Sequence, residues 1–154
     1  MTTSTTGGKQ PRIVVGVDGS GSSRHALRWA ARQGQLTGAR LDVVITWELP
    51  TSFGWVAPYP DDFNPAADAE RAADDEVAAA LRGCPDVSVQ TTVVEGHPAP
   101  TLVEASRGAD LLVLGSRGHG EFAGMLIGSV SQHCVTNAHC PVLVYRGEAD
   151  TSDN

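Results

Sequence analysis

The residues best suited to chemistry lie in one glycine-rich segment, GSRGHGEFAGMLIGSV, at positions 115–130. The segment contains glycines at 115, 118, 120, 124 and 128, one arginine and no lysine. It follows the apolar run at 109–114 and leads into residues with the apolar spacing of a helix. Glycines in such a place let the backbone turn sharply, or they let a ligand come close to it.

A ligand bound there would be an anion, because loop and helix-start N–H groups can point at a phosphate. Gly128 and Ser129 are expected to begin the following helix, and Arg117 would add a positive charge. The spacing matches neither the P-loop pattern GxxxxGK[ST] nor the dinucleotide pattern GxGxxG. It is Gly115-x2-Gly118-x9-Gly128-Ser129, and a plain glycine turn is the alternative interpretation.

Other reactive side chains form weaker patterns. His133, Cys134, His139 and Cys140 suggest zinc, but neighbouring helical residues point about 100° apart, so His133 and Cys134 face different sides. A serine hydrolase is poorly supported because the GxSxG elbow is absent. The three cysteines form no CxxC pair and no even disulfide set, which favours a reducing cytoplasm.

Length and composition limit the class of protein. The 154 residues fit one domain, and 41% hydrophobic with only 5% aromatic residues suits helices packed on a buried sheet. The net charge of −7 and pI of about 5.0 disfavour nucleic-acid binding. No apolar run approaches the roughly 20 residues that span a bilayer, so no membrane association is expected. Residues 1–10 and 148–154 are expected to be disordered tails, and the amino-terminal one does not resemble a signal peptide.

Strands and helices are expected to alternate through the domain at 11–147. Short Val-, Ile- and Leu-rich runs predict strands at 12–17, 41–47, 87–94, 110–115 and 142–146, the third with one wetter face as on a sheet edge. Apolar spacing predicts helices at 22–33, from Pro65 with Asn64 as its N-cap, at 98–107 and at 130–138. Gly34 and Gly38 are expected to mark the end of the first helix, and Pro141 the end of the last.

This order predicts a doubly wound α/β domain, with a parallel sheet and helices on both faces. Ligands bind such sheets beyond the carboxyl ends of the strands, where successive connections go to opposite faces. Asp18 and Gly19 follow the first strand, and Gly115 ends the fourth. If these strands are neighbours, both glycine-containing loops line one crevice.

Three segments, in order, resemble the universal stress protein family. They are IVVGVDGS at 13–20, ADLLVLGSRGHG at 109–120 and GSVSQHCVTNAHCPVLVYR at 128–146. The G-x2-G-x9-G-[S/T] spacing resembles the ATP-binding motif of that family, and no position of the motif departs from it. The resemblance covers about Arg12 to Arg146 and points to the ATP-binding branch.

The resemblance implies a Rossmann-like, adenine nucleotide alpha hydrolase-like fold, with a five-stranded parallel sheet in the order 3-2-1-4-5. It implies ATP at the ends of strands one, two and four. Asp18 would contact the nucleoside, and the alternative is that it only stabilises its own turn. Val44 would contact adenine through its backbone. The whole implied binding set is Gly16, Asp18, Val44, Gly115, Arg117, Gly118, Gly128, Ser129, Val130 and Ser131, with Ser131 the weakest member.

The function that the resemblance implies is nucleotide-dependent regulation of a stress response or growth state. Mg²⁺ could accompany ATP, with Asp18 a ligand through water, but no residue is assigned as catalytic, so hydrolysis is expected to be slow at most. An enzyme of a related adenine-nucleotide fold that transfers AMP or phosphate is the alternative, although DGSGSSR at 18–24 lacks its SGGxDS loop. A phospho-acceptor domain would need an aspartate ending the third strand, where VVEGHP stands at 93–98. The family also implies a homodimer through strand 142–146 and an unknown protein partner.

Overall fold

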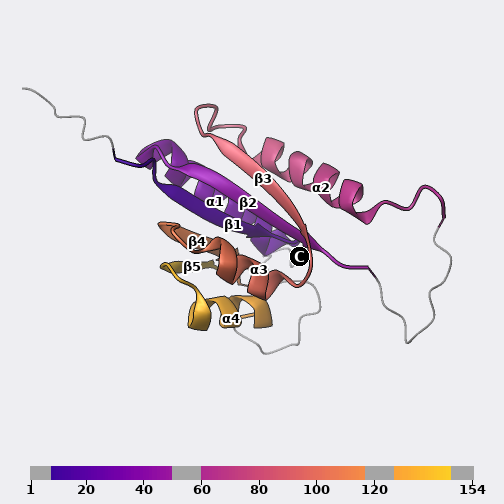
Figure 1. Ribbon diagram of the computed structural model, residues 1–154. Coiled ribbons are helices and arrows are strands. Elements are labelled where there is room, and N and C mark those ends of the chain that lie inside the picture. Colours follow the sequence, from indigo (N-terminus) through magenta and orange to yellow (C-terminus); the bar gives the residue numbers. More distant parts are fainter. Residues whose placement is uncertain (1–7, 50–59, 117–126, 147–154) are drawn as a thin grey trace, which may run out of the picture.

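The computed structural model describes residues 8–49, 60–116 and 127–146. Strands and helices alternate strictly in these residues (Figure 1). The strands are β1 (Arg12–Val17), β2 (Arg40–Trp47), β3 (Val89–Glu95), β4 (Leu111–Gly115) and β5 (Val142–Tyr145). The helices are α1 (Gly21–Thr37), α2 (Pro65–Ala80), α3 (Pro98–Ala105) and α4 (Ser129–Asn137). The predicted alternation is therefore confirmed.

All five strands form one parallel sheet in the order β3-β2-β1-β4-β5, as predicted. The central strand β1 is buried from Ile13 to Val17. β3 lies at one edge, and its residues alternate between half-buried and exposed, which confirms the expected wetter face. β5 lies at the other edge, where all four of its residues are half-buried.

Two apolar cores cover the two faces of the sheet. On one face, α1 places Ala26, Leu27, Ala30 and Ala31 against the strands, and α2 adds Ala73. On the other face, Leu102 of α3 and Cys134 of α4 pack against strand residues. Figure 1 shows the helix pairs α1, α2 and α3, α4 on opposite sides of the strands. The chain therefore changes faces between α1, which follows β1, and α4, which follows β4.

The observed helix ends differ from the predicted ones by a few residues, and Gly34 and Pro141 do not have the roles that the sequence predicted for them. Gly34 lies inside α1, where a β-carbon would come within 3.0 Å of the Ala39 carbonyl oxygen and of Val87, so this glycine permits close packing. Gly38 does end α1, with a left-handed φ of 74°. α3 stops at Ala105, two residues before the expected end. α4 ends at Asn137 because Ala138 is already extended, so Pro141 does not terminate it.

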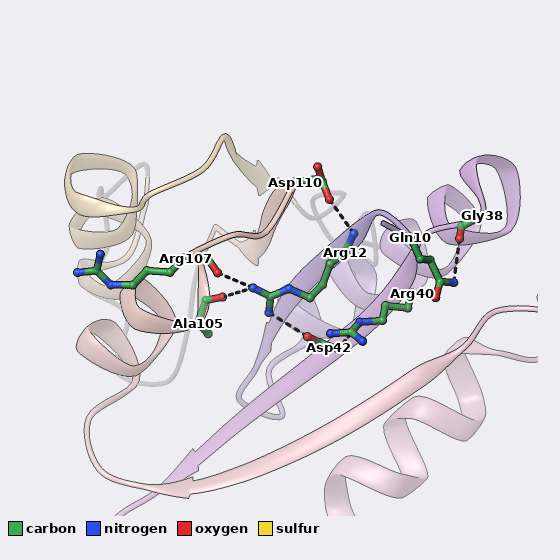
Figure 2. A network of polar contacts seen from close by, with 8 residues as sticks. All are labelled: Gln10, Arg12, Gly38, Arg40, Asp42, Ala105, Arg107 and Asp110. Carbon is green, nitrogen blue, oxygen red and sulfur yellow. Dashed lines mark hydrogen bonds and ion pairs between the residues drawn. The ribbon is translucent and has the colours of Figure 1, made fainter. Parts of the chain in front are cut away.

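At the amino-terminal edge of the sheet, Arg12 connects β1 to three other segments (Figure 2). Its guanidinium donates to Asp42 of β2 across 2.9 Å, and to the carbonyls of Ala105 and Arg107 across 3.2 and 2.6 Å. Its backbone N–H donates to the Asp110 carboxylate across 2.8 Å, which explains why β4 begins after Asp110. Arg12 thus binds the last carbonyl of α3 and a carbonyl just after the helix, and it fixes the edge opposite to the predicted crevice.

Candidate functional site

The candidate site lies where adjacent strands β1 and β4 end and send their helices to opposite faces. Ile13 to Val15 of β1 pair with Leu111 to Val113 of β4, so the two strands are neighbours as predicted. α1 begins four residues after β1 ends, and α4 begins beside the end of β4. The helix starts therefore flank one position at the carboxyl edge of the sheet, which is where doubly wound sheets bind ligands.

Asp18 shapes the turn between β1 and α1. Its Oδ1 accepts a hydrogen bond of 2.9 Å from the backbone N–H of Ser20. Ser20 is the N-cap of α1, and its hydroxyl accepts from the N–H of Ser23 across 3.2 Å. Gly19 has φ 81°, a left-handed conformation that suits glycine in this turn. Asp18 thus has the turn role that the sequence raised as an alternative, and its exposed carboxylate is still at the edge where a ligand would bind.

The start of α4 is tied directly to the end of β4. The Gly128 N–H donates to the Ser116 carbonyl across 2.7 Å, so the residue before α4 lies directly beside the residue after β4. The Ser131 hydroxyl donates to the Gly115 carbonyl across 2.7 Å, and Ser131 is 4% exposed. The proton of this hydroxyl is therefore used within the protein, which leaves the backbone N–H as the group that Ser131 could offer to a ligand.

The start of α4 has the electrostatics of an anion site, whereas the Asp18 carboxylate lies at the start of α1. α1 and α4 carry no acidic residue in the first turn, although the chain as a whole is acidic. Gly128 is the N-cap of α4, as predicted, and no side-chain hydrogen bond caps this helix. Ser129 is exposed and Val130 half-buried. The first-turn N–H groups of α4 thus form the positive end of a helix dipole, and no acidic residue of that first turn neutralises it.

Glycines 115 and 16 serve packing in this structure. A β-carbon on Gly115 would lie 2.7 Å from the backbone carbonyl carbon of Ser22 and from the backbone nitrogen of Ser23. A β-carbon on Gly16 would lie 2.7 Å from the side chain of Leu114 and 3.0 Å from that of Leu102. Gly115 therefore allows the first turn of α1 to lie against β4, a reason for glycine that the sequence pattern did not reveal.

Val44 lies inside the sheet, 6% exposed and packed in the core on the α3 and α4 side. It pairs with Gly16 of β1 and Thr92 of β3. Pairing with β1 ends at Ile45, so Thr46 is the first β2 residue beyond the end of β1. Thr46 is half-buried and is better placed than Val44 to offer backbone to a ligand at this edge. Only the register of β1 and β2 identifies it, and a single sequence does not contain that register.

Glu76 of α2 is a charged group near the end of β1 that the sequence did not identify. Burial raises the pKa of its carboxyl, as does the nearby Asp18, while Arg24 lowers it. Its Oε2 is buried and has no hydrogen-bond partner among the described residues. Glu76 therefore extends the electrostatic surroundings of Asp18 to the second helix on this face.

Two predicted site residues, Arg117 and Gly118, lie outside the described residues, as do His119 and Glu121. Within the described part of the chain, no group of three or more His, Cys, Asp or Glu side chains could hold a metal ion. Cys84, Cys134 and Cys140 are all free thiols, and Cys134 is fully buried on the apolar face that its position predicted. None of the described helices is both long and apolar enough to cross a membrane.

The sequence was compared with families and individual proteins. Residues 11–146 match the model of the universal stress protein family. Universal stress protein Rv2624c of Mycobacterium tuberculosis is 34% identical over 139 residues, which are 90% of this chain and 49% of that protein. Rv2005c of the same organism is 35% identical over 149 residues, again covering 49% of that protein. The chain thus spans about half the length of the curated relatives it matches.

Solved structures of the family share the fold. The universal stress protein UspA from Lactobacillus plantarum superposes with a TM-score of 0.69 at 21% identity, covering 90% of this chain and 99% of that one. A universal stress protein solved in complex with cAMP has a TM-score of 0.62 at 29% identity, covering 90% and 98%. Each of the two structures covers 90% of this chain, and the second contains an adenine nucleotide.

Proposed function

The chain belongs to the universal stress protein family, and from that premise we propose that it binds ATP at the carboxyl ends of β1, β2 and β4. The observation that supports this most is the pair of helix starts at α1 and α4. They lie on neighbouring strands, their first turns lack acidic residues, and α4 has a glycine N-cap. The positive start of α4 suits a phosphate chain.

In this proposal the phosphates lie against the backbone N–H groups of Ser129, Val130 and Ser131. Gly128, whose own N–H donates to the Ser116 carbonyl, would leave room for them because it has no side chain. Arg117 and Gly118 would complete the grip. Asp18 and the end of β2 at Thr46 would contact the nucleoside, with Gly16 and Val44 forming the sheet beneath it and Gly115 keeping α1 close. A magnesium ion would supply charge neutralisation to the phosphates, and the Asp18 carboxylate could hold it through water.

We infer a regulatory role, with ATP hydrolysis slow at most. Efficient phosphoryl transfer needs a cation on the phosphates, a metal and a group that orients the nucleophile. The proposed site offers one arginine, backbone N–H groups and one carboxylate, and no group is placed as a base. Bound nucleotide would then act by changing the surface that a partner protein recognises.

The relative solved with cAMP favours a second candidate ligand, cyclic AMP. The two ligands differ at the phosphates: ATP needs several N–H contacts and cAMP needs one phosphate site. Isothermal titration with ATP, GTP and cAMP separates the cases. ATP should bind at least tenfold more tightly than GTP and cAMP, and absent or equal binding of ATP and GTP would refute the proposal.

Gly128→Glu tests the phosphate position, because a carboxylate at the start of α4 would oppose the phosphates directly. ATP affinity should fall at least tenfold. Gly83→Glu is the matched control. A β-carbon at Gly83 meets no atom within 4 Å, and Gly83 lies in the turn that follows the carboxyl-terminal end of α2. Arg117→Ala should reduce ATP affinity less than Gly128→Glu does. If Gly128→Glu folds and binds ATP like the unmodified protein, the phosphates do not lie at α4.

A further inference from the structure

The sheet edge at β3 carries a second feature, a groove between β3 and α2 of about 460 Å³. One wall contains Glu70 and Asp74 of α2, and the other contains Thr91, Val93 and Glu95 of β3. Trp47 also lines the groove, in register with Glu95. Figure 1 shows α2 running along β3, at the sheet edge opposite to β5.

The two walls have the periodicity of a linear groove. Glu70 and Asp74 are one helical turn apart, about 6 Å along α2. Thr91, Val93 and Glu95 are alternate residues on one face of β3, spanning about 13 Å. The lining residues therefore follow the directions of α2 and β3, an arrangement that suits an extended chain of about four residues.

The outer edge of β3 is open to another strand. Among the described strands, β3 pairs only with β2, and it is the terminal strand of the sheet. Gln90 and Thr92 are exposed between the groove-lining residues. An edge strand of this kind presents backbone N–H and C=O groups that an extended peptide can pair with.

The charge of the groove selects the partner. Among the described residues, Glu70, Asp74 and Glu95 form no ion pair with a basic residue, and no basic residue lines the groove. These carboxylates do not form a group that could hold a metal ion. A larger organic cation, such as a guanidinium or an ammonium group, can contact them separately and also lie on the Trp47 ring.

We propose that this groove binds a basic, extended segment of a partner protein, which adds to the free edge of β3 and places Arg or Lys side chains against Glu70, Asp74 and Glu95. A second copy of this chain is a poor occupant, because it would bring the same carboxylates and a net charge of −7 to the contact. The groove shares no residue with the proposed ATP site, although Trp47 directly follows Thr46, and the proposal does not depend on ATP binding.

The probe is a short fluorescein-labelled peptide of alternating arginine and valine, measured by fluorescence anisotropy at physiological salt. A peptide with the same charges and proline in place of valine is the control, because proline cannot pair with a strand edge. The alternating peptide should bind at least fivefold more tightly than the proline peptide. The proposal would be overturned if the two peptides bound equally tightly, or if free spermidine competed for the groove as well as the alternating peptide does.

Asp74→Lys and Asp75→Lys form a matched pair of variants. Both residues are exposed neighbours on α2, but only Asp74 lines the groove. Asp74→Lys should weaken peptide binding about tenfold and Asp75→Lys less than about twofold, because charges beyond the direct contact are screened within about 8 Å. The indole N–H signal of Trp47, assigned with Trp47→Phe, should shift on binding. Equal losses in the two lysine variants, or an unmoved Trp47 signal, would contradict binding in this groove.

Discussion

Gly115 at the end of β4 lies directly against Ser22 in the first turn of α1. A β-carbon on Gly115 would be 2.7 Å from the carbonyl carbon of Ser22, closer than side-chain carbons approach backbone atoms. The missing side chain thus sets the distance between β4 and the start of α1. That distance fixes where the two helix starts lie relative to each other, and so the width of the proposed phosphate site.

Gly115→Ala should lower the free energy of unfolding by about 1–3 kcal/mol, because the backbone of α1 would have to move to accept the methyl group. Gly21→Ala, at the first residue of α1, is the control, since a β-carbon there meets no atom within 4 Å. Gly21→Ala should leave the free energy of unfolding unchanged or raise it by up to about 1 kcal/mol. Urea unfolding of both variants checks this. Equal stability of the two would mean that β4 and α1 are not held in contact by Gly115.

Most of the fold could be predicted from the sequence, because its signals are local. Val-rich runs with alternating helical segments predict a parallel sheet, and Asn64-Pro65 marks the start of α2 where the structure places it. The Gly34 error is instructive. A glycine near a helix end predicts a C-cap, but Gly34 instead accommodates Val87, which is far away in sequence.

The candidate site was less predictable, since its geometry depends on register and packing. The glycine spacing indicates the crevice, and Asp18, Gly128 and Ser129 do lie at the carboxyl edge. Thr46 and Glu76 could not be predicted from the sequence. The position of Thr46 depends on where β1 ends beside β2, and that of Glu76 depends on how α2 packs. Arg117 and Gly118 lie outside the described residues and stay predictions.

Arg12→Lys should destabilise the protein by about 2–3 kcal/mol although it keeps the charge. Lysine cannot reproduce the fork that reaches Asp42, Ala105 and Arg107, so partly buried acceptors would lose their donors. Arg71→Lys is the control, because Arg71 pairs with Asp68 on the exposed side of α2 and should cost less than about 0.5 kcal/mol. Denaturant midpoints measure both. Similar midpoints would show that the Arg12 network contributes little.

Glu76→Gln should raise the free energy of unfolding at pH 7. The pKa of Glu76 is raised above its ordinary value of 4.5, chiefly by burial. Its contribution to stability is therefore full below about pH 4.5 and is lost as the pH rises through the raised folded-state pKa. The gain should disappear at pH 4, where both side chains are neutral. Asp75→Asn is the control, and a Gln variant less stable than the unmodified protein at pH 7 would contradict the raised pKa.

Cys134 should make stability fall in alkali. Burial raises the pKa of its thiol from 9.0 to about 11. The folded state holds this proton more tightly than the unfolded state does. The resulting contribution of Cys134 to the free energy of unfolding is therefore full below pH 9 and is lost between pH 9 and 11. It amounts to at most about 3 kcal/mol. Cys134→Ala should flatten the stability profile across this window, whatever its stability at pH 7. An unchanged slope in the alanine variant would show that other groups cause the loss.

Val144→Lys should convert a dimer into a monomer. β5 is an edge strand whose residues are half-buried, and a short apolar edge is a surface that a second copy of the chain could cover. The unmodified protein should sediment at twice the chain mass of 16.1 kDa, and the lysine variant near the single mass, because lysine would be desolvated at the contact. Thr92→Lys on the exposed face of β3, the opposite edge, is the control and should leave the mass unchanged. An unmodified protein that stays monomeric at high concentration would refute the contact, and a dimer broken only by Thr92→Lys would place it at β3.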